Sequence, residues 1–214
     1  MLPCDFEIVD IEQGTPEWLE LRKTKITATD AAVIMGDNPW KSKLTLYHEK
    51  LSDDLPSPPN EAMARGVRLE PIARDKFNQE AGWNMKPAII VRGWAMASLD
   101  GRDEESGDIL EIKCPGEKTH AAAVGGHVPS YYYPQLQHQM YVCGVQTAYY
   151  YSFDGVNGVT VKVERNDEYI EKMLVEEEKF YDCLMLGTPP ETFYGFEKSY
   201  KWKIRKQGNE YVDI

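Results

Sequence analysis

Two spacings of apolar residues alternate along the chain, and they predict a mixture of strands and helices. Short apolar runs bounded by polar residues are typical of strands. They occupy 88–91, 95–99, 108–112, 147–153 and 159–163. Asp100-Gly101 and the polar segment 102–107 separate the second run from the third and predict the turn of a β-hairpin. The last two runs predict a second hairpin around 154–158.

Apolar residues at helical spacing predict helices between and after these strands. The expected helices span 15–22, 30–35, 43–51, 60–81, 119–124, 129–143 and 167–186. Thr15-Pro16 is a typical start, because a hydroxyl caps the helix and proline fits its first turn. Thr29 or Asp30 is expected to cap the second helix, and Pro71 is expected to kink or split the long one. Segment 52–59, with acids and prolines, predicts a loop.

Length and composition favour one globular domain. The chain has 214 residues, 42% of them hydrophobic and 11% aromatic, which is enough for a sizeable core. We find no internal repeat and no domain boundary, so residues 1–214 are expected to form a single domain. The role of the C-terminal tail, 188–214, is left open, and its segment 198–206 carries five cations.

Charge and cysteine content exclude several classes of protein. The net charge of −11 argues against a protein that coats nucleic acid nonspecifically, although an enzyme with a local basic channel is compatible with it. The four cysteines are far apart and lack the ligand spacing of zinc or iron–sulfur sites, so free thiols are expected. No stretch approaches transmembrane length and the first residues do not look like a signal peptide, so a cytoplasmic protein without membrane contact is expected.

The candidate chemistry lies on the two strands of the first hairpin. Glu111 and Lys113 are two residues apart, so their side chains leave the strand on the same face. Asp100, at the end of the preceding strand, can fold back beside Glu111. Carboxylates this close favour a bound cation such as magnesium, and the lysine could orient or deprotonate a metal-bound water. The alternative is two solvated strand ends with ordinary surface charges.

Further polar residues could support such a site. Glu70 shares a helical stripe with apolar neighbours and needs a partner, which is either Arg74 one turn away or a metal or catalytic water. Thr29 at a helix start and the nearby Arg22 could bind an anion, although Thr29 could equally be only a cap. The tyrosines of 131–133 favour packing in a core or interface, with stacking on bases as the alternative.

Motifs in a fixed order along the chain are shared with one enzyme family. They are Trp18-Leu19-Glu20-Leu21-Arg22, Ile26-Thr27-Ala28-Thr29, Gly66-Val67-Arg68-Leu69-Glu70, Asp100-Gly101 with Glu111-Ile112-Lys113-Cys114-Pro115, and Gln135-Leu136-Gln137. Over residues 12–155 the chain resembles bacteriophage lambda exonuclease relatives, in the YqaJ-type viral recombinase group of PD-(D/E)xK nucleases. The ordered set is far more specific than any single motif.

The resemblance implies a fold and an activity. The fold would be α/β, a restriction-endonuclease-like core with a central mixed β-sheet flanked by helices. The activity would be magnesium-dependent, 5′-to-3′ digestion of one strand of linear duplex DNA, with two metals per site and manganese as a substitute. The resemblance also implies binding to duplex ends, a ring-shaped homotrimer and a single-strand annealing partner. A related endonuclease and a non-catalytic factor that binds DNA ends are the alternatives.

The same resemblance implies roles for the residues at the catalytic centre. Asp100 and Glu111 would be metal ligands, with the Ile112 carbonyl as a third. Lys113 would orient or activate the attacking water. Glu70 would hold water or the second metal.

Residues outside that centre would order the site or contact the DNA substrate. Gln135 would order the site from the next helix. Arg22 and Thr29 match positions that grip the 5′-phosphate, although the family more often has serine where this chain has Thr29. Met63 would be an apolar wedge just before the Gly66 turn.

Overall fold

The computed structural model describes residues 6–52, 60–191, 206–207 and 210–211. Its strands are β1 (Glu7–Ile8), β2 (Ile26–Thr27), β3 (Lys86–Arg92), β4 (Ala95–Arg102), β5 (Ile109–Lys113), β6 (Thr147–Phe153), β7 (Gly158–Glu164), β8 (Lys206–Gln207) and β9 (Glu210–Tyr211). Its helices are α1 (Pro16–Lys23), α2 (Ala28–Ile34), α3 (Lys43–Leu51), α4 (Glu61–Ala81), α5 (Glu117–Val124), α6 (Tyr133–Cys143) and α7 (Asp167–Leu186), with a 3-10 turn, η1 (Ser130–Tyr132).

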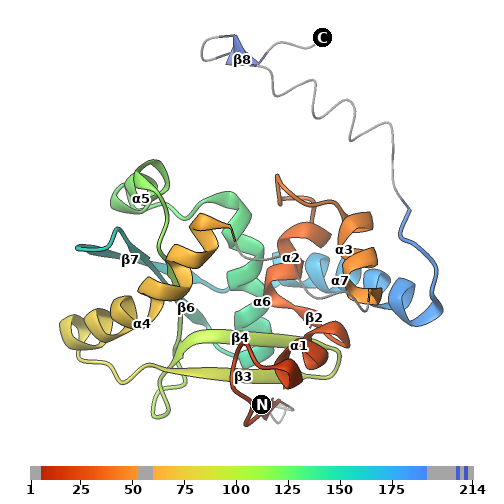
Figure 1. Ribbon diagram of the computed structural model, residues 1–214, viewed down its shortest axis with the longest axis horizontal. Helices are drawn as coiled ribbons and strands as arrows, with labels where there is room; N and C mark the ends of the chain where they lie inside the picture. Colours follow the sequence, from red (N-terminus) through yellow and green to blue (C-terminus); the bar gives the residue numbers. More distant parts are fainter. Residues whose placement is uncertain (1–5, 53–59, 192–205, 208–209, 212–214) are drawn as a thin grey trace.

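A seven-stranded mixed sheet forms the centre of the molecule (Figure 1). The strand order is β1-β3-β4-β5-β6-β7, and β2 pairs with β4 beside this path. The pairs β2–β4 and β5–β6 are parallel, whereas the other pairs are antiparallel. The predicted α/β class, with a central mixed sheet flanked by helices, is confirmed. β8 and β9 form a separate two-stranded sheet.

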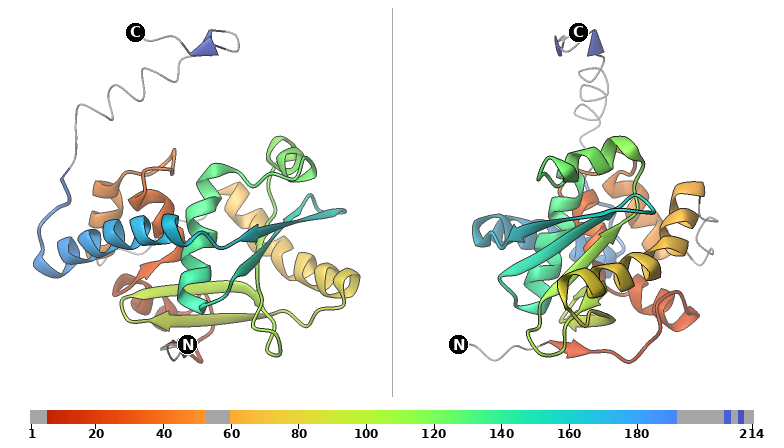
Figure 2. Two further views of the ribbon diagram at one scale, coloured as in Figure 1. Left: turned by 180° about the vertical axis from the view of Figure 1, so that it is seen from behind. Right: turned by 90° about the vertical axis from the view of Figure 1, so that its left-hand side faces the viewer.

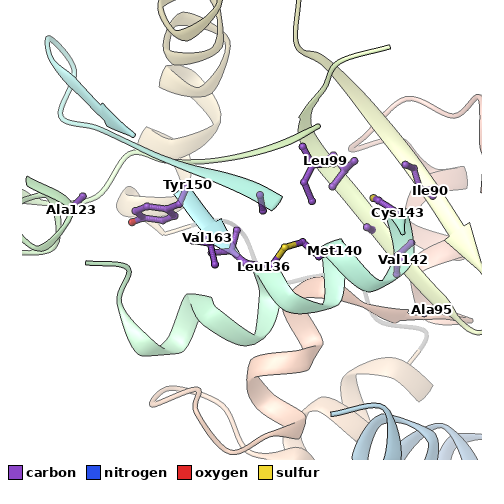
Figure 3. Close-up of a cluster of buried hydrophobic side chains, with 13 residues drawn as sticks. Ile90, Ala95, Leu99, Ala123, Leu136, Met140, Val142, Cys143, Tyr150 and Val163 are labelled. Atoms are coloured by element: carbon purple, nitrogen blue, oxygen red, sulfur yellow. The ribbon is translucent and has the colours of Figure 1, made fainter. Parts of the chain in front are cut away.

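The two faces of the sheet are covered by different helices (Figure 2). On one face, Leu136 and Met140 of α6 pack against Leu99, Ile109 and Tyr150 (Figure 3). Successive side chains of a strand alternate between the two faces of the sheet. The other face therefore carries the residues that lie next to these along the strands, and side chains of α4 pack against them. This second cluster joins Ala73, Phe77, Leu110, Ile112, Tyr151 and Phe153. Helices α2 and α7 lie beyond α6.

The first hairpin turns later than the sequence predicts. β4 continues through Asp100 and Gly101 to Arg102, and Gly101 pairs with Leu110 of β5. The predicted turn at Asp100-Gly101 is therefore wrong. The turn lies at 103–108, where the Asp103 carboxylate accepts hydrogen bonds from the backbone amides of Glu105 and Ser106. At Gly101 a Cβ would lie 2.8 Å from Met85 Cβ, so glycine is needed for close packing there and not for a turn.

The second helix also begins differently. α2 starts at Ala28 with Thr27 as the N-cap residue, two residues earlier than predicted, so neither Thr29 nor Asp30 is the cap. Instead the Asp30 carboxylate reaches back and accepts the backbone N–H of Thr27 at 2.8 Å. The two-residue strand β2, which ends at Thr27, was not predicted because two residues are too short to show a period.

Pro71 was expected to kink or split the long helix, and since α4 is continuous through Pro71 the split does not occur. Gly66 also lies inside this helix, so there is no Gly66 turn. The helix ends as predicted, because Gly82 adopts a left-handed conformation with φ 72°. Of the predicted loop, residues 53–59 lie outside the described residues, as do 198–205 of the cationic tail segment. Within the described part of the chain, no helix is long and apolar enough to cross a membrane.

Strands β4 and β5 stay together for only two residue pairs, Gly101–Leu110 and Arg102–Ile109. Further back, the same edge of β4 pairs with β2 at Ala95 and Met96. The edge of β4 is thus shared between two short partners. The β4 residues between these two paired segments, up to Asp100, lie where β5 has separated from β4.

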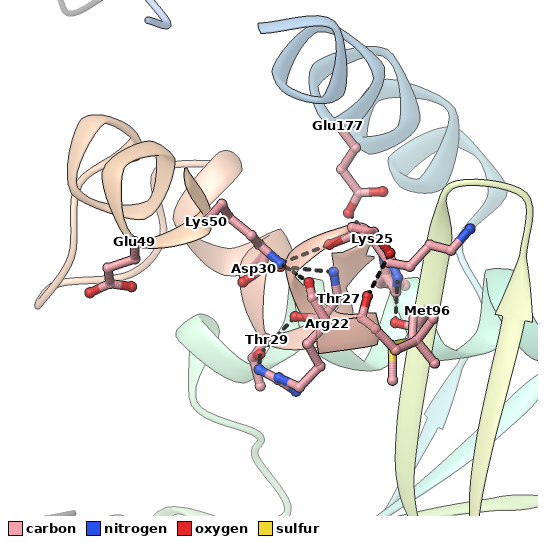
Figure 4. Close-up of polar contacts among 12 residues, drawn as sticks. Arg22, Lys25, Thr27, Thr29, Asp30, Glu49, Lys50, Met96 and Glu177 are labelled. Atoms are coloured by element: carbon pink, nitrogen blue, oxygen red, sulfur yellow. Dashed lines mark hydrogen bonds and ion pairs between the residues drawn. The ribbon is translucent and has the colours of Figure 1, made fainter. Parts of the chain in front are cut away.

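A buried ion pair joins the three N-terminal helices (Figure 4). The Lys50 ammonium on α3 lies 2.6 Å from Asp30 Oδ2 on α2, with both side chains less than one-tenth exposed. It also donates to the carbonyl oxygens of Arg22 at 2.8 Å and Lys25 at 2.7 Å. Burial alone would raise the pKa of Asp30, but the charges of Lys50 and Arg22, with the hydrogen bonds from Lys50 and the Thr27 backbone, together outweigh burial and hold this pKa below its ordinary value. Lys50 therefore fixes the connection between α1 and α2.

We expect Lys50→Met to lower the free energy of unfolding by about 3–5 kcal/mol, because it leaves the Asp30 charge buried without its partner. Denaturant titration measures this loss. Lys41→Met is the matched control, since the exposed Lys41–Glu49 pair should contribute only about 0–1 kcal/mol.

The loss should also depend on pH. Because the folded-state pKa of Asp30 is lowered, the ion pair contributes fully above the ordinary pKa of about 4 and loses its contribution on acidification. The difference between Lys50→Met and wild type should therefore shrink below about pH 4. A loss no larger than that of Lys41→Met at neutral pH would contradict this role for Lys50.

Candidate active site

A buried carboxylate lies at the centre of the site. Glu111 on β5 is only 2% exposed, and each of its oxygens accepts hydrogen bonds. Oε1 accepts from Lys113 Nζ and, at 2.6 Å, from Gln135 Nε2. Oε2 accepts from Gln139 Nε2 at 2.5 Å. The expectation that Glu111 and Lys113 share one face is confirmed, but Glu111 lies in the interior and not at a solvated strand end.

Asp100 lies where β4 and β5 separate. Its Oδ2 accepts the backbone N–H of Ile112 at 2.7 Å, so the carboxylate takes the place that a neighbouring strand would occupy. Burial raises the pKa of Asp100 well above its ordinary value, and the charge of Glu111 raises it further. The predicted approach of Asp100 to Glu111 is therefore present. It brings two like charges together in a poorly solvated place.

The Lys113 ammonium compensates these negative charges. Burial alone would lower the pKa of Lys113, but the carboxylates of Glu111 and Asp100 outweigh burial and raise it above the ordinary value. The ammonium also lies 5.2 Å from the centre of the Tyr132 ring, which is within the range of a cation–π contact. Lys113 is therefore held as a cation between the two acids and an aromatic face.

Glu70 and Arg74 approach the site from α4. Arg74 Nη2 donates to Glu70, so the ordinary partner expected from the helical spacing is confirmed. The same guanidinium donates through Nε to the backbone carbonyl of Asp100 at 2.5 Å. Burial raises the pKa of Glu70, Arg74 opposes the shift, and the charge of Glu111 adds to it. Glu70 is thus close enough to Glu111 to feel its charge.

Helix α6 is fixed against the sheet by a second buried group. His138 Nδ1 lies 2.8 Å from Glu177 Oε1 on α7, and Nε2 lies 3.2 Å from the Met96 carbonyl on β4. Both side chains are fully buried. Burial alone would lower the pKa of His138, but the charge and hydrogen bond of Glu177, with the Met96 carbonyl and the Asp30 charge, together outweigh burial and raise it. The pair sets the position of α6, and with it the two glutamines on Glu111.

Arg22 and Thr29 meet as the sequence predicts. Arg22 Nη2 donates to Thr29 Oγ1 at 3.2 Å, and Thr29 Oγ1 lies 3.0 Å from Thr27 Oγ1 (Figure 4). The guanidinium is also stacked over the Trp18 ring, 4.5 Å from its centre. A guanidinium and hydroxyls at the start of a helix can together bind a phosphate.

The predicted wedge residue is an exposed side chain of α4. Met63 is 57% exposed near the start of α4, where its backbone N–H is capped by Asn60. Among the residues that the structure describes, no hydrogen bond or ion pair links Met63, Arg22 or Thr29 to the acids and Lys113. The predicted site residues thus fall into one candidate catalytic cluster, Asp100, Glu111, Lys113, Glu70 and Gln135, and two separate candidate contacts for a substrate.

Sequence reasoning missed several residues that support this cluster. The sequence motifs include Gln135 but not Gln139, although Gln139 lies four residues after Gln135 and therefore on the same helix face. The bond from Arg74 to the Asp100 backbone, and the buried His138–Glu177 and Lys50–Asp30 pairs, join elements far apart in sequence. Local spacing carries no signal for them.

The donor set fits a hard divalent cation, although side chains alone would not complete its coordination. Among the described residues, no group of three or more His, Cys, Asp or Glu side chains is placed to hold a metal. Asp100 and Glu111 supply carboxylate oxygens, and the backbone of Ile112 lies beside them. Magnesium binds through one or two carboxylates and keeps several waters, so such a set suffices.

Comparison with known proteins places this geometry in a family. Residues 17–146 match the model of the YqaJ-like viral recombinase domain. The uncharacterized protein YqaJ of Bacillus subtilis (strain 168) is 29% identical over 185 residues, which cover 82% of this chain and 58% of that protein. The uncharacterized protein R354 of Acanthamoeba polyphaga mimivirus is 28% identical over 64% of this chain and 28% of its own length. The chain thus spans less than two thirds of either relative.

Solved structures agree with the family match. The alkaline exonuclease LHK-Exo from Laribacter hongkongensis has a TM-score of 0.71 and 28% identity, and the match covers 87% of this chain and 99% of that one. A phage-related exonuclease from Haemophilus somnus 129PT, at 15% identity and a TM-score of 0.54, shares the fold. The likeness to LHK-Exo, together with the family match, indicates a nuclease. With its family model matched over more than half of its length, the chain belongs to the YqaJ-like viral recombinase family.

Proposed function

We propose that the protein is a magnesium-dependent exonuclease that digests one strand of linear duplex DNA in the 5′-to-3′ direction. The observation that carries the proposal is the convergence of Asp100, Glu111 and Lys113 where β4 and β5 separate. The likeness to LHK-Exo, whose structure is also known in complex with dAMP, supports a nuclease that acts on DNA.

Each residue of the cluster has a separate task in this proposal. Asp100, Glu111 and the Ile112 carbonyl would hold the first metal, and Glu70 would hold water or a second one. When bound, divalent cations supply an activated water and stabilise negative charge on the reacting phosphate. Lys113, held as an ammonium, would donate to the attacking water and orient it. Gln135 and Gln139 keep Glu111 in place through their bonds to its two oxygens.

The direction of digestion follows from a separate anion site. Arg22 and Thr29 would bind the 5′-phosphate of the strand being cut, because a terminal phosphate carries more charge than an internal diester and a guanidinium offers paired donors to it. Each cut creates a new 5′-phosphate, which can occupy the same place. A homotrimeric ring and an annealing partner fit this activity and belong to the proposal.

Lys113→Met should abolish most digestion of linear duplex DNA, by about 100-fold or more, because loss of the group that positions the attacking water can cost that much. The rate is measured with magnesium and with a chelator, on linear and on closed circular DNA. Lys86→Met is the control, since Lys86 makes an exposed ion pair with Glu104. Full activity of Lys113→Met would contradict the assignment, and cutting of closed circles by wild type would indicate an endonuclease.

Arg22→Ala should remove most of the preference for 5′-phosphorylated over 5′-hydroxyl ends. A charge-assisted contact contributes about 1.5–3 kcal/mol, or roughly ten- to a hundredfold in rate. Matched phosphorylated and dephosphorylated duplexes are digested by each variant. The adjacent Lys23→Ala removes a cation that pairs with Glu20 and should keep the preference. A wild-type enzyme with no end preference would refute the phosphate site.

Met63→Ala should slow digestion of duplex DNA far more than digestion of single strands. An exposed apolar side chain can replace stacking that is lost when a terminal base pair opens, and opening costs a few kcal/mol. Initial rates on the two substrates are compared. Ile72→Ala, on the same helix and exposed to a similar extent, should slow neither. Equal slowing of both substrates by Met63→Ala would indicate a packing role instead.

A further inference from the structure

Trp40 is a large aromatic side chain that the fold holds in solvent. It lies between α2 and α3 and is 74% exposed. Its position is fixed by Asn38 Oδ1, which accepts the backbone N–H groups of Trp40 at 2.8 Å and Lys41 at 3.0 Å. A tryptophan usually buries most of its ring. One that is held outward next to a candidate active site therefore indicates a binding role.

A continuous chain of aromatic rings connects Trp40 to the catalytic cluster. Trp40 and Tyr131 meet edge to face with centroids 5.0 Å apart and an interplanar angle of 76°. Tyr131 meets Tyr132 at 4.5 Å and 65°. The Lys113 ammonium lies over the Tyr132 ring, 5.2 Å from its centre. The two tyrosines belong to η1, directly before α6.

The exposure of these rings decides which of them can accept a ligand. Lys113 already lies over Tyr132, whose ring also packs against Tyr150 with centroids 5.8 Å apart. Trp40 has its ring contact with Tyr131, and a tryptophan residue that is 74% exposed keeps ring surface open to solvent. Flat aromatic surface of this kind binds nucleobases of any sequence, because every base has a π-face.

We propose that Trp40, supported by Tyr131, is a stacking site for an unpaired base of the strand that is cut. The proposal rests on the proposed function, since the ring chain ends at Lys113. It adds a contact that positions the strand through a base, in addition to contacts with phosphate. Trp40 is a positioning residue, because it lies at the far end of the ring chain from Lys113. The tyrosines of η1 thereby serve both packing and binding.

The first experiment measures binding without cleavage. Fluorescence anisotropy of labelled, 5′-phosphorylated single-stranded oligonucleotides is recorded with calcium in place of magnesium, for wild type, Trp40→Ala and Trp40→Phe. We expect Trp40→Ala to bind about tenfold more weakly, as loss of one stacked base predicts, and Trp40→Phe to recover most of the affinity. Leu186→Ala, which removes a side chain 77% exposed at the end of α7, should leave affinity unchanged.

The second experiment locates the stacked base. A series of oligonucleotides carries one abasic position each. At one position the missing base should weaken wild-type binding about tenfold and leave binding by Trp40→Ala unchanged, because both changes remove the same contact. Independent losses at every position, or equal affinities of wild type and Trp40→Ala, would overturn the proposal. So would a wild-type protein that binds none of the oligonucleotides.

The outcome is separable from that of the proposed function. A wild-type protein that shows the abasic pattern but digests no DNA with magnesium would refute the exonuclease and keep the stacking site. If wild type digests DNA but Trp40→Ala binds the oligonucleotides as tightly as wild type does, the exonuclease is kept and the stacking site is refuted. Sedimentation of wild type and Trp40→Ala tests whether Trp40 instead contacts a second copy of the chain. A changed oligomeric state without the abasic pattern would overturn the stacking site.

Discussion

Burial of the Glu111 carboxylate is the constraint on which the site depends. A charged group inside a protein is stable only if its oxygens are hydrogen-bonded and its charge is compensated. Lys113 supplies the charge, and Gln135 and Gln139 supply donors from α6. Helix α6 must therefore lie directly over β5, and the His138–Glu177 pair holds it there. Asp100 can approach Glu111 because β4 and β5 separate at this point.

Much of the fold could be predicted because its longer elements carry strong periodic signals. Helix α7, the hairpin of β6 and β7, and the Gly82 end of α4 agree with the pattern. The exact end of β4 could not be predicted, since Asp100-Gly101 has the composition of a turn and only its pairing across the sheet keeps it extended. The two-residue strands β1 and β2 depend entirely on partners distant in sequence.

The candidate site likewise has a part that could be predicted from the sequence and a part that could not. Pairs close in sequence were predictable and meet in the structure: Glu111 with Lys113 from strand spacing, Glu70 with Arg74 from helix spacing, and Arg22 with Thr29 from the short connection between two helices. The residues that hold these pairs in place could not be predicted, because they lie on other helices and strands. Lys50 donates to the backbone carbonyls of Arg22 and Lys25, which are 28 and 25 residues away in the sequence. Arg74 donates to the backbone carbonyl of Asp100, which is 26 residues away.

The face of α6 that meets the sheet has a consequence for how this family can tolerate insertions and deletions. Gln135 and Gln139 must face Glu111 while His138, between them, faces Met96 and Glu177. One residue gained or lost within this turn would rotate the remainder of the helix by about 100° around its axis. The glutamines and the histidine could then no longer meet their partners together. Length changes should therefore collect before Tyr133 or after Gly144, and the intervening helix should keep a constant length across relatives.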